Sequence, residues 1–192
     1  MAASFKYFSA PMDQIRGVVN DRSCAFCGHQ GPGIDLDFGI PPNEKSLPSG
    51  VGCFDCLEKR RFLIEHDTEA GLIDTEGIHR IYPSHDPDLN MSTVSLDALL
   101  ATPDIKAWQR ATWLAHCGEF MTYVGIWVKQ DFSRMASDGD GRSLFMSMTD
   151  PDQQNLWDQS IGSSDCEEGW HASYYAFKCL HCGKHRGNWD CP

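Results

Sequence analysis

The chain has 192 residues, of which 41% are hydrophobic, and 27 acidic against 16 basic residues give it a formal net charge of −11. So negative a protein repels a phosphate backbone, which argues against nucleic-acid binding. No run approaches the roughly 18 apolar residues of a membrane span, and residues 1–11 lack a basic start followed by an apolar stretch. We therefore expect a cytoplasmic protein with no membrane partner, folded as one domain over residues 1–192.

Three C-x-x-C pairs organise the sequence, because this spacing lets two thiolates converge on one metal ion from a single tight turn. Nine cysteines without an export signal favour thiols and metal over disulfides. The pairs predict zinc as the cofactor, with these metal ligands: Cys24 and Cys27, Cys53 and Cys56, Cys179 and Cys182.

The first two pairs predict a treble-clef-like zinc finger over residues 20–66. Gly28 follows the first pair, as in a knuckle closed by a residue with positive φ, whereas Leu57 begins a run of helix formers after the second pair. Between the pairs, alternating apolar residues predict a strand over residues 34–40 that ends at Pro41. Four thiolates leave no open metal position, so the site would be structural. The alternative is that the two pairs are redox-active or coincidental.

The third pair repeats the knuckle pattern inside a predicted C-terminal β-hairpin over residues 170–192. Two cysteines do not complete a zinc site, and a rival arrangement pairs this knuckle with the first one as a zinc ribbon. The helix-forming run after the second pair favours the treble clef instead. The residues that could complete the third site are Cys191, His185, His181, Cys166, His116 and Cys117.

The middle of the chain predicts a helical core over residues 95–135. Ser95 could cap a short helix, and the Thr102-Pro103-Asp104 sequence is a helix start signal. From there an apolar stripe runs from Ile105 to Trp127, which we interpret as a long buried helix, bent or split at Gly118. A short helix is also expected from Thr149 through Trp157. Strands before, helices between and strands after predict an α+β fold with central helices.

Acidic residues gather in two stretches, residues 63–90 and residues 136–170. The second holds eight carboxylates against the single base Arg142. One interpretation is a solvated surface that keeps the protein soluble. The other is a face that meets a basic protein partner, because complementary potentials speed association. The residues predicted to bind that partner are Asp138, Asp140, Asp150 and Asp152.

Residues 108–118 and 177–184 resemble the CbrC family of bacterial proteins, and the order of the early cysteine pairs also fits that family. The family tends to follow its second pair with Ala-Asp-Gly, where this chain has Leu57-Glu58-Lys59-Arg60. The resemblance implies an association with colicin tolerance, and hence a toxin as the class of partner. It implies no catalytic residue.

Two histidine-containing groups invite other interpretations. His116 beside Cys117 is the pairing of thiol catalysis, but neighbours on a helix do not face each other, so a packed thiol or a ligand for the third pair is favoured. His79 and His85, near Asp86 and Asp88, could form a metal or acid-base cluster. A polar surface loop explains them better.

Two functions follow from these observations. The first is a zinc-binding acidic protein that binds and neutralises a basic protein toxin, such as a nuclease, whose active site attracts phosphate and therefore also carboxylates. The second is a zinc-dependent enzyme with an open metal position near Cys179 and Cys182.

Overall fold

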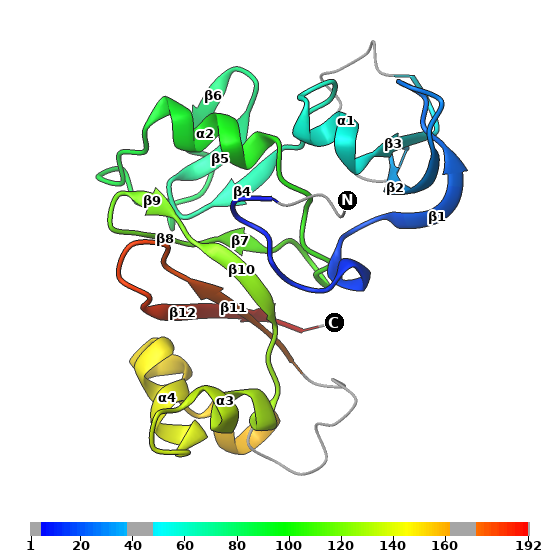
Figure 1. Ribbon diagram of the computed structural model, residues 1–192. Coiled ribbons are helices and arrows are strands. Elements are labelled where there is room, and N and C mark those ends of the chain that lie inside the picture. Colours follow the sequence, from blue (N-terminus) through cyan, green and yellow to red (C-terminus); the bar gives the residue numbers. More distant parts are fainter. Residues whose placement is uncertain (1–4, 38–47, 162–171, 192) are drawn as a thin grey trace.

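The computed structural model describes residues 5–37, 48–161 and 172–191. Figure 1 shows the zinc-finger-like unit beside a body of short sheets, with a helical pair at the opposite end. The mixed α+β class predicted from the sequence is confirmed. The predicted end of the first strand at Pro41 lies outside the described residues, as does Cys166.

The N-terminal unit contains a three-stranded sheet of order β1-β2-β3, followed by a short helix. Its strands are antiparallel, and Gly33 of β2 faces Cys53 of β3. The sequence predicted a strand over residues 34–40, but β2 begins earlier and ends earlier, at Asp35. The elements are β1 (Val18–Ser23), β2 (Gln30–Asp35), β3 (Val51–Cys53) and α1 (Phe54–Glu58).

The body is built from a four-stranded sheet of order β6-β5-β4-β7, a β8-β9 hairpin and a three-stranded sheet of order β10-β11-β12. Helix α2 covers the first of these sheets (Figure 1). A 3-10 turn, Met12–Gln14, precedes β1. The elements are β4 (His66–Thr68), β5 (Gly71–Asp74), β6 (Gly77–His79), α2 (Thr93–Leu100), β7 (Thr112–Trp113), β8 (Ala115–His116), β9 (Glu119–Phe120), β10 (Thr122–Ile126), β11 (Ser173–Lys178) and β12 (His185–Asp190).

Helices α3 (Lys129–Met135) and α4 (Gly141–Met148) form the unit at the far end of β10, followed by η2 (Pro151–Gln153) and the π-helical turn η3 (Trp157–Ile161). Phe132 and Phe145 pack edge to face there at 5.4 Å, against Tyr174 of β11. The predicted short helix from Thr149 through Trp157 corresponds to η2 and the start of η3.

The long helix predicted from Ile105 to Trp127 is wrong, because four strands occupy this stretch. Cys117 and Gly118 both have positive φ, 55° and 74°, and turn the chain between β8 and β9. A near-continuous apolar run fits a buried strand as well as a buried helix. Aromatic and β-branched residues at Trp113, Thr122 and Tyr123 favour the strand. The first helix of the middle region also starts before Ser95, with Ser92 as its cap.

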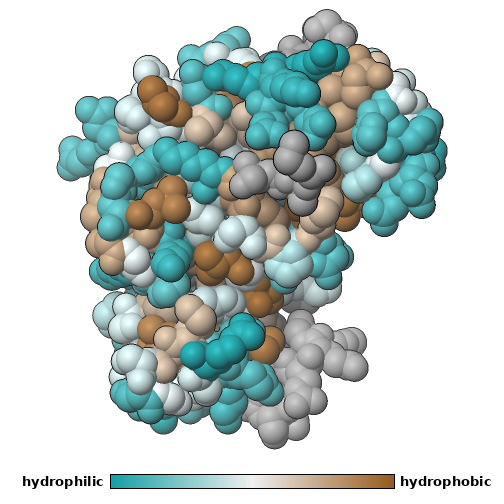
Figure 2. Space-filling view, viewed as in Figure 1, coloured by the Kyte–Doolittle hydropathy of each residue, from teal (hydrophilic) through white to brown (hydrophobic). Residues whose placement is uncertain are grey.

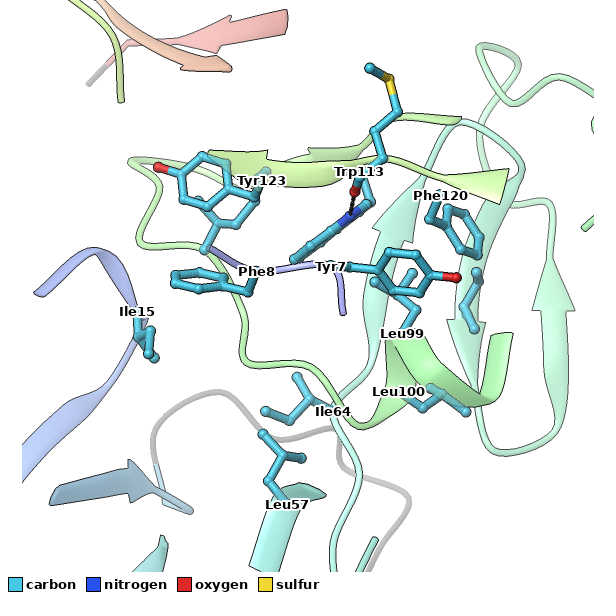
Figure 3. Close-up of a cluster of buried hydrophobic side chains, with 14 of the residues drawn as sticks. Tyr7, Phe8, Ile15, Leu57, Ile64, Leu99, Leu100, Trp113, Phe120 and Tyr123 are labelled. Atoms are coloured by element: carbon cyan, nitrogen blue, oxygen red, sulfur yellow. Dashed lines mark hydrogen bonds between the residues drawn. The ribbon is translucent and has the colours of Figure 1, made fainter. Parts of the chain in front are cut away.

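One core runs from the finger into the body and is centred on aromatic side chains (Figure 3). Trp113 is fully buried, and its indole N–H donates to the Met121 carbonyl at 2.8 Å. On the outer face shown in Figure 2, hydrophobic residues lie in separate patches between hydrophilic ones. The core therefore joins the elements that carry the three cysteine pairs.

Candidate metal centres

The first centre brings together Cys24, Cys27, Cys53 and Cys56, whose Sγ atoms all lie within 4.8 Å of one another. Two of the sulfur-sulfur distances are 3.8 Å, between Cys24 and Cys56, and 3.6 Å, between Cys27 and Cys53. Thiolates bound at about 2.3 Å in a tetrahedron lie about 3.8 Å apart. The four sulfurs are thus spaced as ligands of one metal ion.

The local fold explains this arrangement. Cys24 and Cys27 lie in the turn between β1 and β2, where Gly28 has a φ of 71° and its N–H donates to the Cys24 carbonyl at 2.8 Å. Cys53 is the residue before α1, and Cys56 lies within α1. A knuckle, a hairpin and a pair at a helix start follow in the predicted treble-clef order.

Backbone donors distinguish the thiols of the first centre. Burial raises the pKa of Cys24, but backbone N–H groups outweigh it and lower that pKa to about 6. Two of these donors are the N–H groups of Cys53 and Phe26, at 3.3 and 3.4 Å from the sulfur. Burial and the adjacent sulfurs raise the pKa of Cys56. The surroundings therefore favour the thiolate of Cys24 and disfavour that of Cys56.

The second centre contains His116, Cys117, Cys179 and Cys182, whose ligand atoms also lie within 4.8 Å of one another. Cys117 Sγ is 3.9 Å from Cys182 Sγ, and His116 Nδ1 is 3.4 Å from the same sulfur. This set of donors completes the third cysteine pair. It also excludes the zinc-ribbon arrangement, because the first and third pairs belong to different centres.

The two knuckles share one hydrogen-bond pattern. In each, the first cysteine's N–H donates five residues ahead, from Cys24 to the His29 carbonyl at 2.9 Å and from Cys179 to the Lys184 carbonyl at 2.8 Å. Gly183 repeats the role of Gly28, with a φ of 73° and an N–H that donates to the Cys179 carbonyl at 3.1 Å. The same turn therefore presents a cysteine pair at both centres.

The partners of the third pair come from the β8-β9 turn. His116 Nδ1 and Cys117 Sγ are 3.2 Å apart because the positive φ of Cys117 folds adjacent side chains together. The sequence argument against facing neighbours assumed a helix and fails for this turn. Both residues are among the six completions considered from the sequence, and Gly118 directly after Cys117 is the sequence feature that could have indicated a turn.

Three other proposed completions, His181, His185 and Cys191, lie outside the second group of ligand atoms. His181 Nε2 lies 2.6 Å from Glu119 Oε2, and Oε1 of the same carboxylate accepts from the Tyr7 hydroxyl and from Lys6. The His185 ring lies 5.3 Å from Trp127. Cys191 does not belong to either group of ligand atoms found among the described residues.

The centres differ in exposure. At the first centre Cys24, Cys53 and Cys56 are buried and Cys27 is exposed, whereas at the second centre Cys117 and Cys182 are exposed and only Cys179 is buried. Burial raises the pKa of Cys179, but the backbone N–H of Cys182 and the contact with His116 outweigh it and bring the pKa to about 6. The second centre thus exposes two thiols to solution, and the first centre exposes one.

The histidines near residue 80 do not gather into a site. His79 Nε2 pairs with Asp74 Oδ1 at 2.9 Å, and His85 Nε2 pairs with Asp67 Oδ1 at 3.2 Å. His85 is 7% exposed, so the surface-loop interpretation is wrong for this residue. Among the described residues, neither Asp86 nor Asp88 joins them in a metal-binding group.

A family comparison covers both centres. The chain matches an uncharacterised protein family, UPF0167, over residues 2–191. It belongs to that family. The UPF0167 match spans every described element, and the implied link to CbrC and colicin tolerance stays a prediction. No solved structure matches this UPF0167 protein. Among its described residues, no helix is both long and apolar enough to cross a membrane.

Proposed function

We propose that this UPF0167 protein binds two zinc ions, and that both have a structural role. The observation that carries the proposal is that each centre gathers four donor groups within 4.8 Å. A set of four cysteines, or of three cysteines and one histidine, is typical of structural zinc, because soft thiolates and imidazole suit this ion and fill its tetrahedral shell. The eight cysteines in the described residues are free thiols, as such ligands must be.

Each ion would join separate parts of the chain. At the first centre, the β1-β2 turn would be tied to the start of α1. At the second, the β8-β9 turn would be tied to the β11-β12 turn, with Cys117 and Cys182 separated by 65 positions. Short strands and a five-residue helix bury little apolar surface by themselves. Metal binding would therefore supply folding free energy that these elements lack.

Cobalt substitution tests the two ligand sets. The thiol-reduced chain is stripped of metal and titrated with Co²⁺, whose visible absorption is intense only in tetrahedral sites. Two equivalents should bind, and Cys53→Ser and Cys179→Ser should each remove one spectroscopically distinct component. A weak octahedral spectrum, or one component that both variants abolish, contradicts the proposal. Cys191→Ser is the matched control, because this cysteine lies outside both groups.

The enzyme alternative requires an open metal position at the third pair. His116 and Cys117 supply the third and fourth donors there, so a tetrahedral ion would have no position left for water. A full set of four protein donors favours a structural over a catalytic ion at the second centre. Zinc-dependent hydrolysis would need one of these four ligands to dissociate.

A second candidate function is the binding of a basic protein, including the toxin implied by the family resemblance. Arg142, the single base among residues 136–170, pairs with Asp158 at 2.8 Å, so it does not neutralise the other carboxylates of this stretch. Four carboxylates there are exposed and have no basic partner within the described residues: Asp138, Asp140, Asp150 and Asp152. Such a surface attracts a partner of opposite charge.

The quadruple Asn variant at these four positions tests the partner role. Asp140 caps α4 by accepting from the Ser143 N–H at 3.1 Å, and asparagine retains this capping ability, so the fold should persist. Association with a basic toxin should slow, and its dependence on ionic strength should flatten. The assay is stopped-flow binding at several salt concentrations. Rates and salt slopes equal to those of the wild type would assign the carboxylates to a solvated surface.

A further inference from the structure

A polar cleft of about 270 Å³ is lined by none of the ligands of the two metal centres. Its walls come from β4, β7, the β11-β12 sheet and the segment after α4. Tyr175 and Trp189 give it aromatic surface, and Asp150, Asn188 and Asp190 give it hydrogen-bond acceptors. A concave site with a few convergent polar groups is where a small ligand group binds.

The two arginines of the cleft are already neutralised. Arg186 makes a bidentate pair with Glu69, at 2.9 and 2.7 Å, and also donates to the Ala115 carbonyl at 2.8 Å. Arg110 pairs with Glu65. Because both guanidinium groups face carboxylates, the cleft offers no uncompensated positive charge from them to an anionic ligand.

The histidine of the cleft is engaged as well. His85 Nδ1 accepts two backbone N–H groups, from Ile81 and Tyr82, each at 3.2 Å. Its Nε2 lies 3.2 Å from Asp67 Oδ1. Both ring nitrogens of His85 therefore already have partners.

Three acceptors remain incompletely used. Asp190 accepts only from neutral donors, the Tyr175 hydroxyl at 2.6 Å and the Gln109 N–H at 2.9 Å. Neither Asp190 nor Asp150 has a basic partner in the part of the chain that the structure describes. The buried carboxamide oxygen of Asn188 also lacks a partner there, while its amide nitrogen donates to the Thr112 carbonyl at 2.6 Å. Two carboxylates and one carboxamide oxygen of the cleft therefore have no basic partner among the described residues.

We propose that this cleft binds an alkylguanidinium group, with the carboxylates of Asp150 and Asp190 as its counter-ions. A guanidinium carries five N–H donors in a plane, which suits several separated acceptors and an aromatic wall such as Trp189. A metal ion does not suit the cleft, because its carboxylates do not belong to either group of converging ligand atoms found among the described residues. The group could belong to a free small molecule or to an arginine side chain of a protein partner.

Titration of the metal-loaded full chain tests this proposal. The probes are Nα-acetyl-arginine amide and its neutral urea counterpart, Nα-acetyl-citrulline amide, followed by calorimetry and by the Trp189 indole signal in two-dimensional NMR. The arginine probe should bind saturably and move the Trp189 signal, and the citrulline probe should not. Equal binding of the two probes, or no saturable binding of the arginine probe, overturns the proposal.

Variants locate the site. Asp150→Asn and Asp190→Asn should each weaken binding of the arginine probe about five- to tenfold, because each removes one charge-assisted acceptor. Asp138→Asn is the matched control and should leave binding unchanged, because this exposed aspartate does not line the cleft. Binding that neither cleft variant weakens contradicts the assignment.

Two further probes distinguish the sources of the guanidinium group. Tighter binding of an arginine-containing peptide than of agmatine supports a protein side chain, and the reverse supports a free small molecule. The inference goes beyond the proposed metal role and does not depend on it. Metal content measured on the same samples separates failure of the cleft from failure of the centres.

Discussion

Replacing Cys53 by serine removes one buried ligand from the first centre, which joins β3 to the β1-β2 turn. Cys53 is 4% exposed, and its sulfur lies 3.6 Å from that of Cys27, so no solvent ligand can replace it without rearrangement. Structural zinc contributes on the order of 10–16 kcal/mol in zinc-finger peptides. Shared among four ligands, that is roughly 2.5–4 kcal/mol for each one, which is a lower bound for a variant that loses the whole ion.

This loss should be visible as a change in melting temperature. At roughly 2–4 °C for each kcal/mol in a chain of this size, Cys53→Ser should lower the melting temperature by at least about 5 °C. The assay is thermal unfolding followed by circular dichroism at fixed free zinc, with metal content measured on the same samples. Cys191→Ser should melt like the wild type. If Cys53→Ser melts within about 2 °C (about 1 kcal/mol) of the wild type, the centre contributes little to folding and the reasoning fails.

Three other predictions concern release and packing. A competing chelator should strip the second centre before the first, because Cys117 and Cys182 are exposed, and single-phase loss of both ions would contradict this order. Gly187→Ala should destabilise the fold by about 1–3 kcal/mol in chemical denaturation, since the added Cβ would lie 2.2 Å from the Tyr174 ring. An unchanged denaturation midpoint would mean that β11 and β12 pack less closely at this point than the structure shows. Trp113→Phe should also destabilise the fold by about 1–3 kcal/mol, because the Met121 carbonyl loses the buried indole N–H that donates to it at 2.8 Å. An unchanged midpoint in the same denaturation assay would mean that water replaces this donor.

The sequence predicted the first centre well because its information is local. The C-x-x-C spacing and Gly28 determine the knuckle, and the residues after Cys53 begin α1 as expected. The second centre could be predicted only in part. Its knuckle is equally local, but His116 and Cys117 reach it through the pairing of strands distant in sequence.

The central region shows why periodicity failed. A buried strand and a buried helix both appear as apolar runs, and their difference here lies in one turn, at Cys117 and Gly118. The positive φ of Cys117, a non-glycine residue, cannot be predicted from the amino-acid composition of the segment. The acidic character of the chain was evident from the sequence, but the pairing of Arg110 and Arg186 with glutamates depends on tertiary contacts and appears only in the structure.

Metal stoichiometry of the purified full chain tests the central claim most directly. Elemental analysis combined with native mass spectrometry should find two zinc ions per chain in the reduced wild-type protein. Cys53→Ser and Cys179→Ser should each retain one ion, and the double variant none. A wild type that holds fewer than two ions when saturated, or single variants that both keep two, would contradict the account.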